Sequence, residues 1–114
     1  MINANPWEVW EAIVKYADEP GAKTRPVIIL SNETSYVLAV KGTTHEPRKM
    51  FQGEHRIKKL DGTGLQHDTT VRCGEIYELV EQDLHQKIGE LSVCDISIIQ
   101  TLIEYVRPPI VRFK

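Results

Sequence analysis

Several features that define common protein classes are missing from this 114-residue sequence. It has only two cysteines, Cys73 and Cys94, too few for the disulfide framework of a small secreted protein, so we expect reduced thiols. No run approaches the roughly 18 apolar residues of a membrane helix, so we expect no membrane partner. The segment Met1 to Pro6 lacks the basic and apolar regions of a signal peptide, which predicts a cytoplasmic protein.

The sequence also lacks a recognisable metal motif. Its four histidines are not closely spaced, as metal ligands on one short segment would be. They are His45, His55, His67 and His85. We therefore expect neither a metal nor another cofactor.

Basic residues are concentrated in one stretch, although the whole chain carries a net charge of −2. Between Arg48 and Lys59 there are five basic residues and one acid, Glu54, so this stretch has a net charge of +4. It is either a solvated hairpin or a local phosphate-binding patch, and composition alone does not choose between them.

Short β-branched and aromatic segments predict a mainly β domain. With 41% hydrophobic and 26% charged residues, the chain has the composition of one globular domain, 1–114, with its core at about 9–106. We expect a loop around Pro20 and a short helical turn over Glu81–Lys87. The predicted strands are Val9–Tyr16, Val27–Leu30, Tyr36–Val40, Thr69–Cys73 with an extension to Leu79 left open, and Ile88–Leu91.

The last element is predicted to be a helix. Ser92 and Asp95 have the spacing of a capping box, and Pro108 stops the helix. Its apolar stripe consists of Ile99, Leu102, Ile103 and Val106. Several short strands followed by one helix imply a highly curved sheet or small barrel with the helix packed on it.

Two segments at strand ends carry residues suited to phosphate chemistry. Arg25 precedes Pro26, and its guanidinium fork suits a phosphodiester, unless it only pairs with nearby acids at the surface. In Gly42–His45, hydroxyls and backbone N–H groups suit a phosphate, or form a simple polar turn. His45 suits proton transfer near neutral pH.

Arg72 is expected on the opposite face of its strand from its neighbours Val71 and Cys73, facing either solvent or a groove. Gly74 beside it is unusual inside a strand and indicates a bulge or a close approach.

The order of these segments resembles the MazF/PemK toxin family. The resemblance covers roughly Val9 to Val106. It rests on Lys23–Ser31, Thr43–Arg48, Gly53–Ile57, Gly64–Leu65, Thr70–Cys73 and Ile88–Ser92. It implies an SH3-like small barrel with a C-terminal helix, usually a homodimer. It also implies metal-independent cleavage of single-stranded RNA, and a cognate antitoxin that blocks the groove.

The resemblance implies specific site residues. Arg25, Thr43 and Arg72 match catalytic positions, and His45 is chemically the easiest general base. Contacts to flanking RNA are expected from Thr44, Arg48, Lys49, His55, Arg56 and Lys58. One branch of the family has an acid two positions after its second arginine, where this chain has Gly74. Strand alternation normally turns the adjacent Glu75 to the other face, so it is not an automatic substitute.

The implied mechanism is attack by the ribose 2′-hydroxyl, with Arg25 stabilising the charge on phosphorus and Thr43 and Thr44 holding the phosphate. One alternative is a binding module of the same fold that acts on a protein target, as a related branch does on DNA gyrase. Another is a degenerate member that has lost activity, for which Gly74 is the argument.

Overall fold

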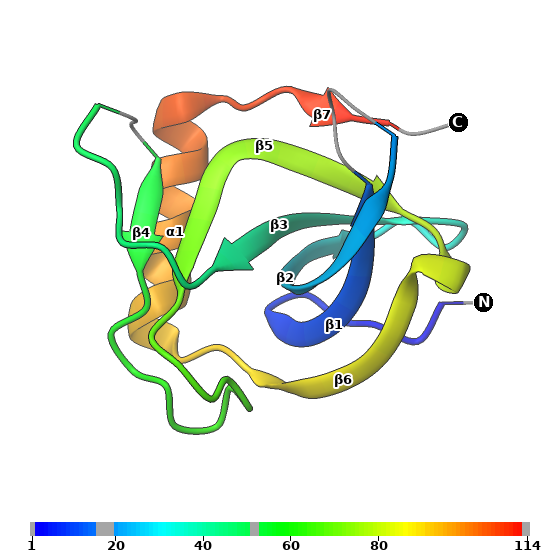
Figure 1. The fold of residues 1–114 in the computed structure, drawn as a ribbon, viewed down its shortest axis with the longest axis horizontal. Coiled ribbons are helices and arrows are strands. Elements are labelled where there is room, and N and C mark those ends of the chain that lie inside the picture. The colour runs from blue at the N-terminus through cyan, green and yellow to red at the C-terminus, as the bar shows by residue number, and fades with distance from the viewer. Residues whose placement is uncertain (1, 16–19, 51–52, 113–114) are drawn as a thin grey trace.

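The computed structural model describes residues 2–15, 20–50 and 53–112, in which one strongly curved sheet dominates the fold (Figure 1). A helix packs against β4 and β5. The elements are β1 (Glu8–Lys15), β2 (Ala22–Asn32), β3 (Val37–Thr43), β4 (Glu54–Arg56), β5 (Thr70–Leu79), a 3-10 turn (Glu81–Asp83), β6 (Leu84–Glu90), α1 (Val93–Val106) and β7 (Ile110–Val111).

The strand order is β4-β5-β3-β2-β1-β6, with antiparallel neighbours, while β7 pairs in parallel with β5. The predicted mainly β fold with a C-terminal helix is therefore confirmed. Within the described ranges no pairing joins β4 to β6, so the sheet curves like a barrel but stays open.

The strand predictions hold best where both faces of the sheet are buried. Along β2, Val27 and Ile29 enter one core and Ile28 the other, which explains the unbroken apolar run. The strand starts earlier than predicted, at Ala22, because backbone pairing with β1 continues through polar residues. The extension of β5 to Leu79 is confirmed, whereas Tyr16, the predicted end of β1, lies outside the described residues.

One predicted element is wrong. The helical turn expected over 81–87 is limited to the 3-10 turn Glu81–Asp83, and Leu84–Glu90 forms β6. Pairing with β1 supplies the backbone hydrogen bonds of this segment, and Leu84 packs on the first core. Tertiary pairing thus overrides the local pattern. The short strand β7 was not predicted.

Two core clusters occupy opposite faces of the sheet. The first, on the face opposite α1, includes Ala12, Val27, Ala39 and Tyr77. The second lies under α1 and includes Val9, Ile28, Val40, Val71 and Ile99. A residue that pairs across strands with a member of the first cluster projects to the same side of the sheet. Its side chain therefore lies on the face that α1 does not cover.

The helix begins and ends as predicted. The Ser92 hydroxyl accepts a hydrogen bond from the Asp95 N–H at 3.2 Å, as an N-cap does. At the other end Arg107 has a φ of 51° and donates its N–H to the Ile103 carbonyl before Pro108 ends the turn. No helix in the described part of the chain is long and apolar enough to cross a membrane.

Candidate functional site

Three cationic residues lie on three neighbouring strands, on the face opposite α1. Arg25 of β2 pairs with Ala12, Lys41 of β3 pairs with Val27, and Lys41 also pairs with Arg72 of β5. Because paired residues project to the same side, all three share the face of the first core cluster. We call Arg25, Lys41 and Arg72 the cationic row. The structure thus brings together both predicted arginines and adds a lysine.

A cavity of about 250 Å³ opens at the Arg72 end of the row. Its charged lining includes both Lys41 and Arg72 together with two acids. The residues that line it are Lys41, Arg48, Glu54, Arg72, Gly74, Glu75 and Tyr77. We call it the Arg72 cavity. Of the two predicted positions for Arg72, solvent or a groove, the structure shows the groove.

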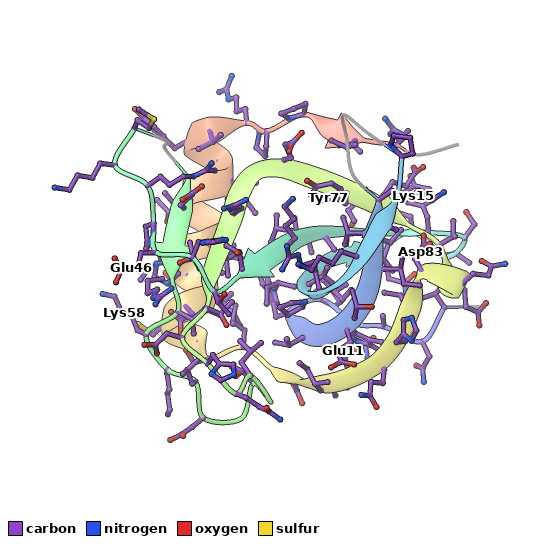
Figure 2. The ribbon with its side chains drawn as sticks, viewed as in Figure 1. Glu11, Lys15, Glu46, Lys58, Tyr77 and Asp83 are labelled. Atoms are coloured by element: carbon purple, nitrogen blue, oxygen red, sulfur yellow. The ribbon has the colours of Figure 1, made fainter. Side chains whose placement is uncertain are left out.

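A second cavity of about 300 Å³ opens at the Arg25 end. Arg25 and the predicted Thr44 share its wall with Glu11 and His67, which were not predicted as site residues. Glu11 faces β6, where Gln86 Nε2 donates to its Oε2 at 3.1 Å (Figure 2). We call this the Arg25 cavity. One end of the cationic row therefore lines the Arg72 cavity, and the other end lines the Arg25 cavity.

The turn after β3 presents the predicted threonines differently. Thr43 is buried and its hydroxyl accepts the N–H of His45 at 3.4 Å, so it shapes the turn. Thr44 is exposed beside Arg25. His45 is exposed and lines neither cavity.

Arg56 of β4 ties this turn to the sheet. Its Nη1 donates to the carbonyl oxygens of Thr44 and His45 at 3.3 and 3.2 Å, and to the Thr70 hydroxyl at 3.1 Å. One guanidinium nitrogen thus fixes two turn carbonyls to β5. Arg56 therefore fixes the position of the turn that carries Thr44, in addition to contributing a positive charge.

Glu54 of β4 links the two arginines of the Arg72 cavity. It accepts from Arg48 N, Nε and Nη2 at 2.9, 3.1 and 2.6 Å, and its Oε2 lies 3.7 Å from Arg72 Nε. Burial alone raises the pKa of Glu54, but the hydrogen bonds from Arg48 outweigh it and leave the pKa below its usual value. Arg72 Nε is buried and has no hydrogen-bond partner among the described residues.

A bulge in β5 changes which residues share the face of Arg72. Between the pairs Lys41–Arg72 and Ala39–Tyr77, β3 has one residue, whereas β5 has the four residues 73–76. The predicted bulge near Gly74 is confirmed. The extra residues reset the alternation, so Glu75 lines the same cavity as Arg72. The expectation that Glu75 turns to the opposite face is wrong for this reason.

His55 has a structural environment. It is buried, and its Nε2 lies 2.7 Å from Oδ1 of Asp95, which is also fully buried. Asp95 further accepts from the Lys58 and Lys59 N–H groups and the Ser92 hydroxyl. The predicted capping acid therefore joins α1 to β4 and the loop that follows. His55 is therefore enclosed between β4 and α1 and does not line either cavity.

The described part of the basic stretch 48–59 contains one strand, β4. β4 pairs with β5. Lys49 and Lys58 are exposed. Lys58 lies on the β4 side of the molecule, as does Glu46 (Figure 2).

The described His, Cys, Asp and Glu residues are the ones that could supply the grouping that a metal ion needs. In residues 2–15, 20–50 and 53–112 no three His, Cys, Asp or Glu side chains are grouped to bind an ion. Both cysteines are free, as predicted; Cys94 is exposed, and burial raises the pKa of Cys73 to about 12. That thiol is therefore un-ionised at neutral pH.

A curved sheet with a terminal helix, and a cationic row whose ends line two cavities, together define a small mainly β protein. The model of the PemK-like, MazF-like toxins of type II toxin–antitoxin systems matches residues 5–106, and the chain belongs to this family. The resemblance stated from the sequence is thus confirmed. No curated protein matches the chain.

Solved structures of mycobacterial proteins share the fold. Two mycobacterial endoribonucleases, one in complex with its cognate antitoxin, each superpose with a TM-score of 0.73 at 20% identity. The alignment with the complexed endoribonuclease covers 91% of this chain and 94% of that protein. The alignment with the other covers 94% of this chain and 93% of that protein. The Mycobacterium tuberculosis toxin MazF-mt6 has a TM-score of 0.65 at 22% identity, over 86% of this chain and 95% of its own.

Proposed function

We propose that this protein is an endoribonuclease toxin that cleaves single-stranded RNA by attack of the ribose 2′-hydroxyl on the adjacent phosphate, without a metal. The observation that carries the proposal is the cationic row of Arg25, Lys41 and Arg72, whose ends line two open cavities. Membership of the toxin family and the endoribonuclease activity named for its structural neighbours support the same assignment.

Arg25 stabilises the charge that develops on phosphorus, because a guanidinium stays protonated and its fork matches two phosphate oxygens. Arg72 is the second clamp. Its Nε is a buried donor without a hydrogen-bond partner in the described chain, and a phosphate oxygen would satisfy it.

The two threonines have different tasks. Thr43 holds the turn through the His45 N–H, and Thr44 offers an exposed hydroxyl beside Arg25 to the scissile phosphate. His45, exposed in the turn next to Thr44, is a histidine suited to proton transfer. Loss of the Thr43 hydroxyl is expected to act through the position of the turn.

Flanking RNA contacts fall to the exposed basic residues. Lys49 and Lys58 act as phosphate contacts, and Arg48 and Arg56 contribute charge while holding Glu54 and the turn. We leave His55 out of the RNA-binding set, because it is buried against Asp95. The deoxyribose strand of DNA lacks the nucleophile and is expected to remain intact.

The biological partners follow from the family and the charge of the site. A cognate antitoxin, as in one of the neighbouring structures, would inhibit by covering the cationic row with an acidic segment. We further propose a homodimer that acts on RNA in the cytoplasm.

The test is incubation of antitoxin-free protein with labelled single-stranded RNA in EDTA. Wild type is expected to cut at defined sites and leave cyclic-phosphate ends, and Arg25→Ala to be slower by at least about 100-fold. Arg25→Lys keeps the charge but loses the fork and should remain impaired. Lys15→Ala, which removes a positive charge outside both cavities, is the control. Intact RNA with wild-type protein across varied sequences would contradict the proposal.

A further inference from the structure

The Arg72 cavity contains two carboxylates in different states. Glu54 is bound three times by Arg48, and its side chain is only 4% exposed. Glu75 is exposed, and Tyr77 donates its hydroxyl to Glu75 Oε1 at 3.2 Å. A carboxylate already held by an arginine fork is a poor proton acceptor, because that fork stabilises its ionised form. Glu75 is therefore the acid of this cavity that can accept a proton.

Lys41 is the ammonium of the same cavity. Its Nζ lies 5.4 Å from the centre of the Tyr77 ring, and no carboxylate in the described residues is within ion-pairing distance. Burial, followed by the positive charge of Arg72, lowers its pKa below the ordinary value, with Glu75 opposing. A lysine in such a site gives up a proton more readily than one in water.

Tyr77 positions both groups. Its hydroxyl holds Glu75 and its ring faces Lys41, and the β5 bulge places Glu75 on this side. The other charged side chains around the pair are Arg25 from β2, Arg48 from the loop after β3, Glu54 from β4 and Arg72 from β5. A carboxylate, Glu75, and an ammonium group, Lys41, thus share one cavity with Arg48 and Arg72, whose guanidinium groups suit a phosphate.

We propose that Glu75 and Lys41 are the proton acceptor and the proton donor of the RNA cleavage. The assignment rests on the proposed nuclease function and deepens it. Glu75 takes the proton of the 2′-hydroxyl while the 2′-oxygen forms a bond to phosphorus. The bond from phosphorus to the 5′-oxygen breaks, and that oxygen takes a proton from the Lys41 ammonium. The products are a 2′,3′-cyclic phosphate and a free 5′-hydroxyl, and solvent exchange resets both side chains.

The assignment is tested by single-turnover cleavage against pH, with binding measured on RNA carrying deoxyribose at the scissile nucleotide. Wild type is expected to give a bell-shaped profile. Glu75→Gln should be at least about 100-fold slower and lose the acidic limb, while binding changes by less than about threefold. Lys41→Arg should bind as wild type and stay slow, because arginine keeps its proton.

Rescue from the neighbouring position separates chemistry from structure. A Cβ at Gly74 would meet no atom within 4 Å, and Gly74 lines the same cavity. Glu75→Gln combined with Gly74→Glu is therefore expected to recover at least about tenfold of the lost rate. Glu33→Gln, in the exposed β2–β3 turn, is the matched control for removal of a carboxylate.

Three outcomes would overturn the assignment. If wild type cleaves and both Glu75→Gln and Lys41→Arg cleave within threefold of it, the acid–base pair is wrong while the nuclease function stands. If His45→Asn removes the acidic limb and Glu75→Gln does not, the acceptor is His45. If wild type cleaves no RNA, the proposed function and the pair fail together.

Discussion

Nε2 of His55 in β4 lies 2.7 Å from Oδ1 of Asp95 in the first turn of α1, and both side chains are buried. The same carboxylate accepts the Lys58 and Lys59 N–H groups. A histidine in the most basic stretch of the sequence thus acts as an internal link between the sheet and the helix.

Asp95→Asn is expected to destabilise the fold by about 3 kcal/mol, because the amide nitrogen would face donors that now meet a carboxylate oxygen. The check is the free energy of unfolding from urea titration. Asp61→Asn, at an exposed position, should change it by less than about 0.5 kcal/mol. Equal stability of the two variants would show that the buried link is unimportant.

Glu8 predicts a pH-dependent contribution to stability. Burial alone raises its pKa, but donors from the Asn5 backbone, Trp10, the Asn5 side chain and Lys87 outweigh it and lower the pKa from 4.5 to about 2. A carboxyl whose folded pKa is depressed contributes stability above its unfolded pKa, and that contribution is lost as pH falls from 4.5 towards 2. Urea midpoints of wild type and Glu8→Gln should therefore differ most near pH 6 and converge towards pH 2. A difference that is constant with pH would contradict the assignment.

Replacement of two glycines by alanine should affect the stability of the fold to different extents. Gly64 has a φ of +76°, and a Cβ there would contact the Ile88 carbonyl in β6. Gly64→Ala is expected to cost at least about 2 kcal/mol, since the left-handed conformation is strained and β6 must shift. Gly74→Ala should remain within about 0.5 kcal/mol, because its Cβ would occupy open space. The measurement is the thermal melting temperature of each variant. An equal loss of stability in the two variants would mean that the Gly64 contact is not tight.

The exposed lysines Lys49 and Lys58 predict a salt effect on RNA binding. If each contacts one phosphate, replacing both by alanine should reduce the slope of log affinity against log salt by about 1.4, at about 0.7 per phosphate on a single strand. The measurement uses RNA with deoxyribose at the scissile nucleotide, so that cleavage does not interfere. An unchanged slope would place the RNA elsewhere on the surface.

The fold could be predicted where one signal dominated. The apolar run Val27–Leu30 and the Ser92 cap with its stripe of apolar residues both specify their elements locally, and both are found. The segment 84–87 was misassigned because pairing with a distant strand, β1, decides its conformation.

The site was predictable only in part. Arg25 and Arg72 were assigned from the resemblance to the family, and the structure places both on one face of the sheet. Lys41 was missed, although it lies two residues before Thr43 in the same strand. Strand alternation already placed Lys41 on the same face of the sheet as the predicted Thr43. The position of Glu75 depends on the length of a bulge, which the sequence indicates at Gly74 but does not measure.

The most direct test of the nuclease function compares two labelled strands that differ only in the scissile nucleotide, one all-ribose and one with deoxyribose there, incubated with wild type and Arg25→Ala in EDTA. The account predicts cleavage of the ribose strand by wild type alone, with a cyclic-phosphate end, and an intact deoxyribose strand. Cleavage of the deoxyribose strand at the same bond would contradict it, because the proposed nucleophile is then absent.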